Sequence, residues 1–167
     1  MHALLRDFCK SLAASSVSQA IQAAHWIIPT IQTIHILAVA VIFTSAIMID
    51  LRLWRVIERD VSVTAMARRF FPPVWVFLLV ALASGVLMII GEPRRALENS
   101  TFYLKMALLV SVVVLTCGLQ RSIALDPRFW EATLGRRIGG RIVAGISILL
   151  WCGIVFAGRW IAYTQVG

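Results

Sequence analysis

Apolar residues fill four long blocks of the chain, and short arginine-rich stretches separate them. The blocks cover about residues 26–49, 71–91, 102–121 and 141–163. About 20 apolar residues are enough for a helix to cross the ~30 Å hydrocarbon core of a bilayer. Residues 26–167 are therefore predicted to form an all-α, integral membrane four-helix bundle without a soluble domain.

Residues 1–25 have a different pattern, in which apolar and charged residues are mixed. Four apolar residues are spaced so that they share one face of a helix: Leu4, Leu5, Phe8 and Leu12. This spacing predicts an amphipathic interfacial helix that lies at the membrane surface. Ser15 and Ser16 interrupt it, and a second short helical piece at about 17–25 leads into the first span.

Composition supports a membrane protein and argues against a nucleic-acid-binding one. Hydrophobic residues make up 60% of the chain, and the mean hydropathy is +0.87. The net charge of +8 comes from basic residues that lie between apolar spans, with no separate domain to carry them. Such residues indicate contact with anionic lipid headgroups, so the expected partner is the lipid bilayer.

The distribution of Lys and Arg predicts the orientation. Ten of the 16 basic residues lie between spans one and two or spans three and four: Arg52, Arg55, Arg59, Arg68, Arg69, Arg121, Arg128, Arg136, Arg137 and Arg141. The positive-inside rule places these connections in the cytoplasm. We therefore expect a multi-pass protein of the bacterial inner (cytoplasmic) membrane, with both termini in the periplasm.

One histidine, His35, lies inside the first span. It follows Trp26 by nine residues, which is about 13 Å along a helix. Gln32 precedes it by three residues and so shares its helix face. An ionisable residue inside a span is a candidate functional site, although an imidazole that hydrogen-bonds to a neighbouring helix as packing is an equal alternative.

Several cations are predicted at the same, outer side of the membrane as His35. They lie at the end of span two, the start of span three and the end of span four: Arg94, Arg95, Lys105 and Arg159. Neutral imidazole is a good axial ligand of haem iron, and haem propionates pair with Lys or Arg. A haem b site with His35 on the iron and these cations around the propionates is consistent with the pattern. For Lys105 and Arg159, snorkelling of the side chains to the lipid headgroups is the alternative.

The second iron ligand stays open. Met88 and Met106 lie at a suitable depth, although Met is more often packing material. His25 is about 15 Å from His35 along a continuous helix, so both reach one iron only if the chain folds back at Pro29. All eight Asp and Glu residues are expected at span ends or in loops, which argues against a buried acidic relay.

Other features favour a non-catalytic alternative. Ala81 with Gly85 and Gly153 with Ala157 form two small-xxx-small faces, the pattern by which membrane helices approach closely. Together with the amphipathic N-terminus, these faces would serve as docking surfaces of a membrane subunit or assembly scaffold, within a homo- or hetero-oligomer. The three cysteines form no CxxC pair and are expected to be free.

Short motifs resemble a family of small bacterial four-helix membrane proteins known only as a domain of unknown function. The matching stretches are Trp26-Ile-Ile-Pro29, Ile34-His35-Ile36, Asp50-Leu-Arg-Leu53, Phe71-Pro72, Ser84-Gly85 and Phe102-Tyr-Leu-Lys105. The order of His35, Arg52, Arg69, Pro72, Ser84-Gly85 and Lys105 is also distantly similar to HemJ-type protoporphyrinogen oxidases and CopD-like membrane domains. This similarity implies haem b bound through His35, with Lys105 near the cofactor.

The leading prediction is a haem b protein that transfers electrons near the periplasmic face, between quinone and a periplasmic redox protein. The scaffold and a HemJ-like porphyrinogen oxidase remain the alternatives, so the sequence leaves open whether the chain is an enzyme.

Overall fold

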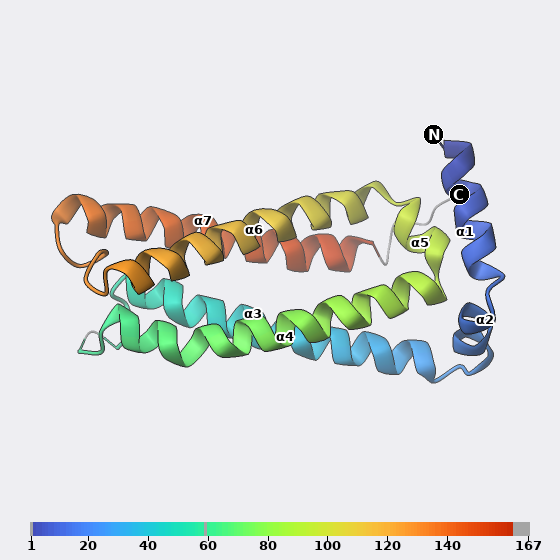
Figure 1. Ribbon diagram of the computed structural model, residues 1–167, viewed down its shortest axis with the longest axis horizontal. Coiled ribbons are helices and arrows are strands. Elements are labelled where there is room, and N and C mark those ends of the chain that lie inside the picture. Colours follow the sequence, from blue (N-terminus) through green and yellow to red (C-terminus); the bar gives the residue numbers. More distant parts are fainter. Residues whose placement is uncertain (1, 59, 162–167) are drawn as a thin grey trace.

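The computed structural model describes residues 2–58 and 60–161, with side chains from Arg6 onward. Arg59 and the predicted end of the fourth span at residue 163 lie outside these residues. The described part forms seven helices and no strands (Figure 1). They are α1 (His2–Ala13), α2 (Ser16–Ala23), α3 (Ile27–Leu53), α4 (Val63–Gly91), α5 (Pro93–Leu97), α6 (Ser100–Leu125) and α7 (Leu134–Trp160).

Four of the helices, α3, α4, α6 and α7, are long and apolar enough to cross a membrane, with hydropathies of 2.0 to 2.6. They contain 26 to 29 residues, which at 1.5 Å per residue corresponds to roughly 39–44 Å. This exceeds the ~30 Å of the hydrocarbon core, so their ends extend into the headgroup region or the helices tilt. The prediction of a multi-pass, all-α four-helix bundle is confirmed.

The helices extend beyond the predicted spans, mainly at one end of the bundle. α3 ends at Leu53 rather than at residue 49, and α6 ends at Leu125 rather than at residue 121. α7 begins at Leu134 rather than at residue 141. Hydropathy marks only where apolar residues stop, whereas a helix satisfies its own backbone groups and continues among charged residues.

The start of the second long helix differs most from the prediction. The sequence predicts that Pro72 and Pro73 open this span, but both lie inside α4. The helix begins instead after Ser62, whose hydroxyl accepts a hydrogen bond from the Ala65 amide at 3.1 Å. This N-cap satisfies one of the free N–H groups at the helix start. The prolines remove two internal hydrogen bonds without ending the helix.

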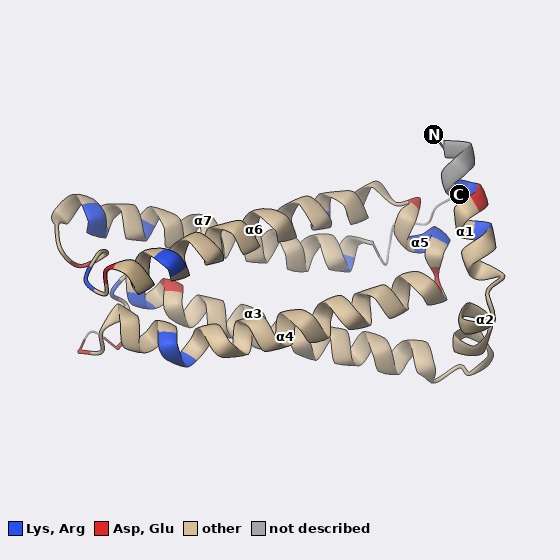
Figure 2. Ribbon diagram, in the orientation of Figure 1, with Lys and Arg blue, Asp and Glu red and all other residues tan. Residues whose placement is uncertain are grey.

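The long helices pack as two pairs, α3 with α4 and α6 with α7, and the pairs meet through α3 and α7 (Figure 1). We call the end that carries α5 the α5 end. The opposite end, with the connections at residues 54–62 and 126–133, is the arginine-rich end, where Lys and Arg gather (Figure 2). On α6 the buried residues begin only at Val112. Residues 100–111 of α6, which lie nearer the α5 end, therefore contribute no fully buried side chain.

The two small-residue faces are used inside the bundle. Ala81 and Ala157 are buried. A Cβ at Gly153 would lie 3.2 Å from Leu108, so α7 approaches α6 closely there, and a Cβ at Gly85 would contact His35. These faces bring helices of the same chain together, and they do not form outward docking surfaces.

The N-terminal helices lie across the α5 end of the bundle (Figure 1). The predicted break is confirmed, because α1 ends at Ala13 and α2 begins at Ser16. Ser18 Oγ donates to Ile90 O at 2.8 Å, and Gln22 Nε2 donates to Gly91 O at 2.8 Å. These bonds satisfy carbonyls at the C-terminus of α4, which have no partner within the helix.

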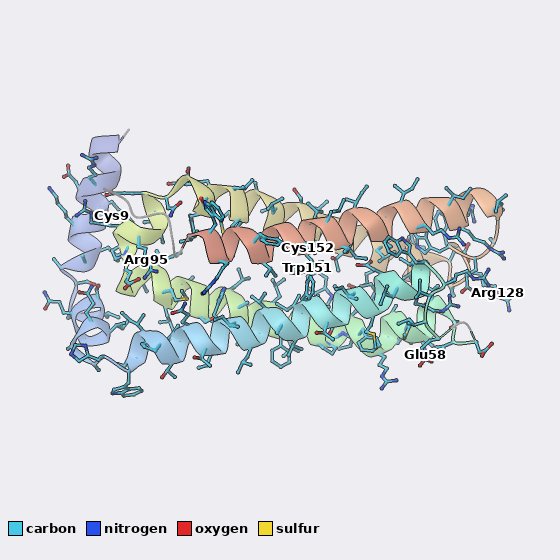
Figure 3. All side chains as sticks on the ribbon, turned by 180° about the vertical axis from the view of Figure 1, so that it is seen from behind. Cys9, Glu58, Arg95, Arg128, Trp151 and Cys152 are labelled. Atoms are coloured by element: carbon cyan, nitrogen blue, oxygen red, sulfur yellow. The ribbon has the colours of Figure 1, made fainter. Side chains whose placement is uncertain are left out.

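The cysteines are free, as predicted. Cys9, labelled at the α5 end in Figure 3, is completely buried. Burial raises the pKa of the Cys9 thiol, so the thiol stays protonated and packs as a small apolar group.

Candidate functional site

Three polar side chains from three helices meet near the α5 end. His35 on α3 lies between Ser84 on α4 and Lys105 on α6. The imidazole Nδ1 is 2.9 Å from Ser84 Oγ, and Nε2 is 3.4 Å from Lys105 Nζ. The sequence predicts that His35 and Lys105 come together, and the structure places them in contact. In the sequence, Ser84 stood out only as part of the Ser84-Gly85 motif. The structure shows that its hydroxyl contacts the imidazole of His35.

Hydrogen-bond geometry assigns the imidazole protons. The Ser84 hydroxyl has one hydrogen, and its Oγ lies 2.7 Å from Val80 O, to which it donates. Ser84 Oγ is therefore an acceptor towards His35, and Nδ1 carries the hydrogen of that bond. In the neutral imidazole, Nε2 then has a lone pair directed towards Lys105. A nitrogen in this state can bind a metal or accept a proton.

Two glycines lie against these polar side chains. A Cβ at Gly85 would lie 3.6 Å from His35 Cε1, and a Cβ at Gly158 on α7 would lie 3.6 Å from Lys105 Nζ. Both distances correspond to ordinary van der Waals contact, so the helix backbones approach the imidazole and the ammonium closely. All four long helices therefore border the site, as in cofactor sites of other helix bundles.

The other predicted cations lie at the same end but have their own partners. Arg95 Nη1 forms a 2.9 Å ion pair with Glu92 Oε2, and Arg94 Nε lies 3.5 Å from Glu98 Oε1. Arg159 follows Gly158 directly and is exposed. Gln32 is also exposed, one turn before His35. The structure thus brings Lys105 to His35 and leaves these four side chains at the periphery.

Of the three candidates for the second iron ligand, the structure argues against His25 and retains Met88 and Met106. α3 is continuous from Ile27 through Pro29, so the fold-back that would bring His25 to the same iron is absent. His25 is exposed before the start of that helix. Met88 lies one helical turn beyond Ser84 on α4, and Met106 follows Lys105 on α6; both are half-buried. The two methionines stay candidates.

The sequence predicts that every acidic residue lies at a span end or in a loop, and Asp50 does lie in the last turn of α3, but it is buried there. The residue is only 2% exposed. Ser147 on α7 lies beside the carboxyl group, and Oδ2 has no hydrogen-bond partner among the described residues. The sequence did not indicate this burial, because Asp50 directly follows the last apolar residue of the predicted span and the helix continues to Leu53.

A second buried group without a hydrogen-bond partner in the described part of the chain is the Nε1 of Trp151. Figure 3 labels Trp151 near the middle of the bundle, one turn from Ser147 along α7. Among the described residues, no group of three or more His, Cys, Asp or Glu side chains could hold a bare metal ion.

Comparison with known proteins identifies one family. Residues 19–164 match a family described as a family of unknown function, DUF6644. No curated protein and no solved structure matches the chain. The resemblance to an uncharacterised membrane family is thus confirmed, whereas the distant similarity to HemJ-type and CopD-like proteins stays a prediction.

Proposed function

Because the chain belongs to DUF6644, a family of unknown function, we propose a function from its own residues. The protein binds haem b near the α5 end of its bundle and transfers electrons there. The observation that carries the proposal is the 2.9 Å contact between His35 Nδ1 and Ser84 Oγ, which engages one ring nitrogen with the protein and leaves Nε2 for a ligand. Metal-binding histidines usually donate the hydrogen of their other ring nitrogen to a neighbouring acceptor in this way.

The available donor set suits haem better than a bare ion. A bare metal ion needs several protein ligands, and the described residues offer no such group. Haem brings four nitrogen ligands of its own and needs one or two more from the protein. His35 supplies one. Bound haem would supply one-electron transfer chemistry at this position.

The surrounding residues have distinct roles in this proposal. Ser84 orients the imidazole. Gly85 and Gly158 place no Cβ against the imidazole and Lys105. Lys105 has a flexible side chain that can turn from Nε2 to pair with a propionate. Arg94 and Arg95 are close enough to the membrane surface for the same task if they exchange their carboxylate partners.

The location of the site suggests its partners. Lys and Arg gather at the opposite, arginine-rich end, which the positive-inside rule assigns to the cytoplasm of a bacterial inner membrane (Figure 2). The α5 end then faces the periplasm. Electrons would pass between quinone in the bilayer and a redox protein on that side.

The proposal is tested on the full chain, purified in a mild detergent from cells supplied with a haem precursor. We expect a reduced-minus-oxidised absorbance spectrum of b-type haem, with about one haem per chain. A preparation that folds, shown by a cooperative thermal transition, but contains no haem would refute the proposal.

Ser84→Ala is expected to weaken haem binding about 10- to 100-fold, because loss of a partner that orients a ligating histidine costs about this much. Ser84→Thr keeps the hydroxyl and should restore the affinity. Haem titration of both variants measures the effect, together with the midpoint potential, which responds to the hydrogen bond on the ligand. Equal affinities and potentials in wild type and Ser84→Ala would contradict the role of Ser84.

The two alternatives differ in their support. The scaffold alternative rests on two kinds of docking surface. The structure uses the small-residue faces within the bundle, whereas docking through the amphipathic N-terminus stays a prediction. Porphyrinogen oxidase activity stays a prediction. It would use the same haem ligand, His35, as the proposed electron transfer. It can be tested by complementation of a strain that lacks its own oxidase, with His35→Ala as the inactive control.

A further inference from the structure

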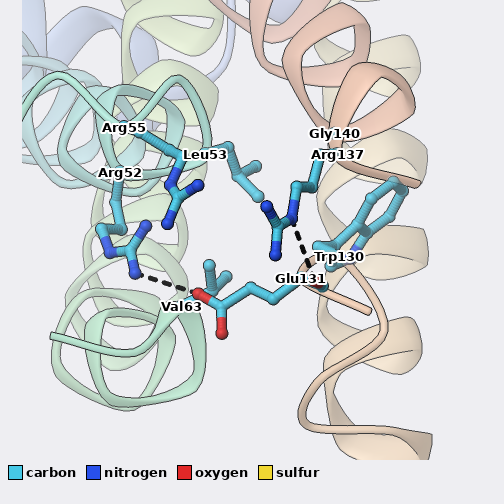
Figure 4. Close-up of a pocket in the computed structure, with 8 residues that line it drawn as sticks. All are labelled: Arg52, Leu53, Arg55, Val63, Trp130, Glu131, Arg137 and Gly140. Carbon is cyan, nitrogen blue, oxygen red and sulfur yellow. Dashed lines mark hydrogen bonds and ion pairs between the residues drawn. The ribbon is translucent and has the colours of Figure 1, made fainter. Parts of the chain in front are cut away.

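A pocket at the arginine-rich end is lined by three arginines and one glutamate, together with apolar residues (Figure 4). It lies between the end of α3, the start of α4 and the connection that leads into α7. Its lining residues are Arg52, Leu53, Arg55, Val63, Trp130, Glu131, Arg137 and Gly140. Three guanidinium groups therefore share this space with one carboxylate.

Arg52 is fixed in the wall of the pocket. Its side chain is only 4% exposed and forms a 2.9 Å ion pair with Glu131 Oε1. Its Nε donates to Val61 O. These bonds use Nε and Nη2, so Nη1 is left for another acceptor. A buried, pre-oriented guanidinium of this kind is well suited to bind a phosphate or carboxylate group.

Arg137 and Arg55 face the same space from the other sides. Arg137 donates from Nε to Glu131 O at 3.0 Å, which leaves both of its Nη atoms outside that bond. Arg55 has a φ of 59°, in the left-handed region that is costly for residues other than glycine. Figure 4 shows the three guanidinium groups turned towards one another. Because like charges repel, this arrangement favours an anion between them.

The rest of the lining is apolar and rigid. A Cβ at Gly140 would lie 3.2 Å from Trp130 and 3.5 Å from Leu53, so these three residues pack tightly. Trp130 Nε1 donates to Ser122 Oγ at 2.8 Å, which fixes the indole. The pocket thus combines an apolar wall with cations at the end of the membrane-spanning helices. This is the depth at which phospholipid phosphates lie.

We propose that the pocket of Arg52, Arg55 and Arg137 binds the phosphate group of an anionic ligand. A phospholipid headgroup and a free phosphate compound share this chemistry. The inference does not rest on haem binding, because the pocket lies at the opposite end of the bundle from His35.

The test uses the full chain in a nonionic detergent with roughly 0.3 M salt, which limits general charge attraction to about 6 Å. Calorimetric titrations compare three probes: short-chain phosphatidylglycerol, short-chain phosphatidylcholine and inorganic phosphate. The variants are Arg137→Gln and Arg55→Gln. Arg121→Gln is the matched control, because it removes one exposed arginine at the same end but outside the pocket.

We expect wild type and Arg121→Gln to bind within about twofold of each other, and both pocket variants to bind about tenfold more weakly, the cost of losing a hydrogen bond to a charged group. Binding of phosphatidylglycerol alone identifies a lipid headgroup as the source, whereas binding of inorganic phosphate as well identifies a free phosphate compound. The proposal is overturned if neither phosphatidylglycerol nor inorganic phosphate binds, or if phosphatidylcholine binds as well as phosphatidylglycerol. It is also overturned if the pocket variants bind like Arg121→Gln. A cooperative thermal transition in each variant shows that it has folded.

Discussion

Replacing His35 with alanine is expected to remove at least about nine-tenths of the haem that purifies with the chain. The residue supplies the one imidazole inside the spans, and loss of even an orienting partner of such a ligand lowers affinity about 10- to 100-fold. Removal of the ligand itself should cost no less. Pyridine haemochrome assays, which give haem per chain, measure the effect directly.

The matched control is His25→Ala, which removes a histidine that is exposed and lies before the start of α3. It should keep the haem content of wild type. If His35→Ala retains full haem content, His35 is a packing residue that bonds to Ser84 and Lys105, and the proposed site is refuted. Loss of haem in His25→Ala would instead place the ligand outside the bundle.

The second large effect is expected for Arg52→Met. The guanidinium is buried and connects α3 to Val61 in one connection and to Glu131 in the other. Its loss removes both bonds and leaves Glu131 without its partner. Because Glu131 is 35% exposed, water solvates part of its charge, and we expect a loss of about 2–3 kcal/mol rather than the larger cost of a fully buried pair. The apparent thermal midpoint should fall by about 5–10 °C.

Two variants separate the ion pair from a general effect of charge. Arg68→Met removes an exposed arginine of α4 and should leave the midpoint within about 2 °C of wild type. The double variant Arg52→Met with Glu131→Met should recover part of the loss, because no carboxylate is then left unpaired. A midpoint for Arg52→Met that equals that of Arg68→Met would show that the buried pair does not stabilise this end.

Much of the fold follows from the sequence because lipid constrains it strongly. A spanning segment must satisfy its backbone internally, so four apolar blocks of sufficient length specify four helices. The ends of these helices depend on local chemistry instead. Ser62, Asn99 and Thr133 cap α4, α6 and α7. These caps are single polar side chains outside the apolar blocks, and hydropathy does not distinguish them from other loop residues.

The candidate site was predictable in part for the same reason. A histidine and a lysine inside apolar spans stand out, and their depths place them at one end, where the structure brings His35 and Lys105 within 3.4 Å. Ser84 could not be selected this way, because serines are common in membrane helices. Its contact with His35 depends on the rotation of α4 about its axis, which only packing determines.

The basic pocket at the arginine-rich end could not be predicted from the sequence, because its arginines were read only as signals of membrane orientation. In the sequence, Arg52, Arg55 and Arg137 count equally with every other arginine near these two connections under the positive-inside rule. Only the folded chain shows that Arg52 is buried while Arg137, more than 80 positions later, shares its partner Glu131.

The coordination of iron by His35 can be measured by electron paramagnetic resonance of the ferric, haem-loaded protein labelled with ¹⁵N-histidine. We predict a ¹⁵N hyperfine coupling in wild type. In His35→Ala supplied with unlabelled imidazole, we predict that a ¹⁴N coupling replaces it. A haem-loaded protein without ¹⁵N coupling, or one whose coupling persists in His35→Ala, would contradict the assignment of His35 as the iron ligand.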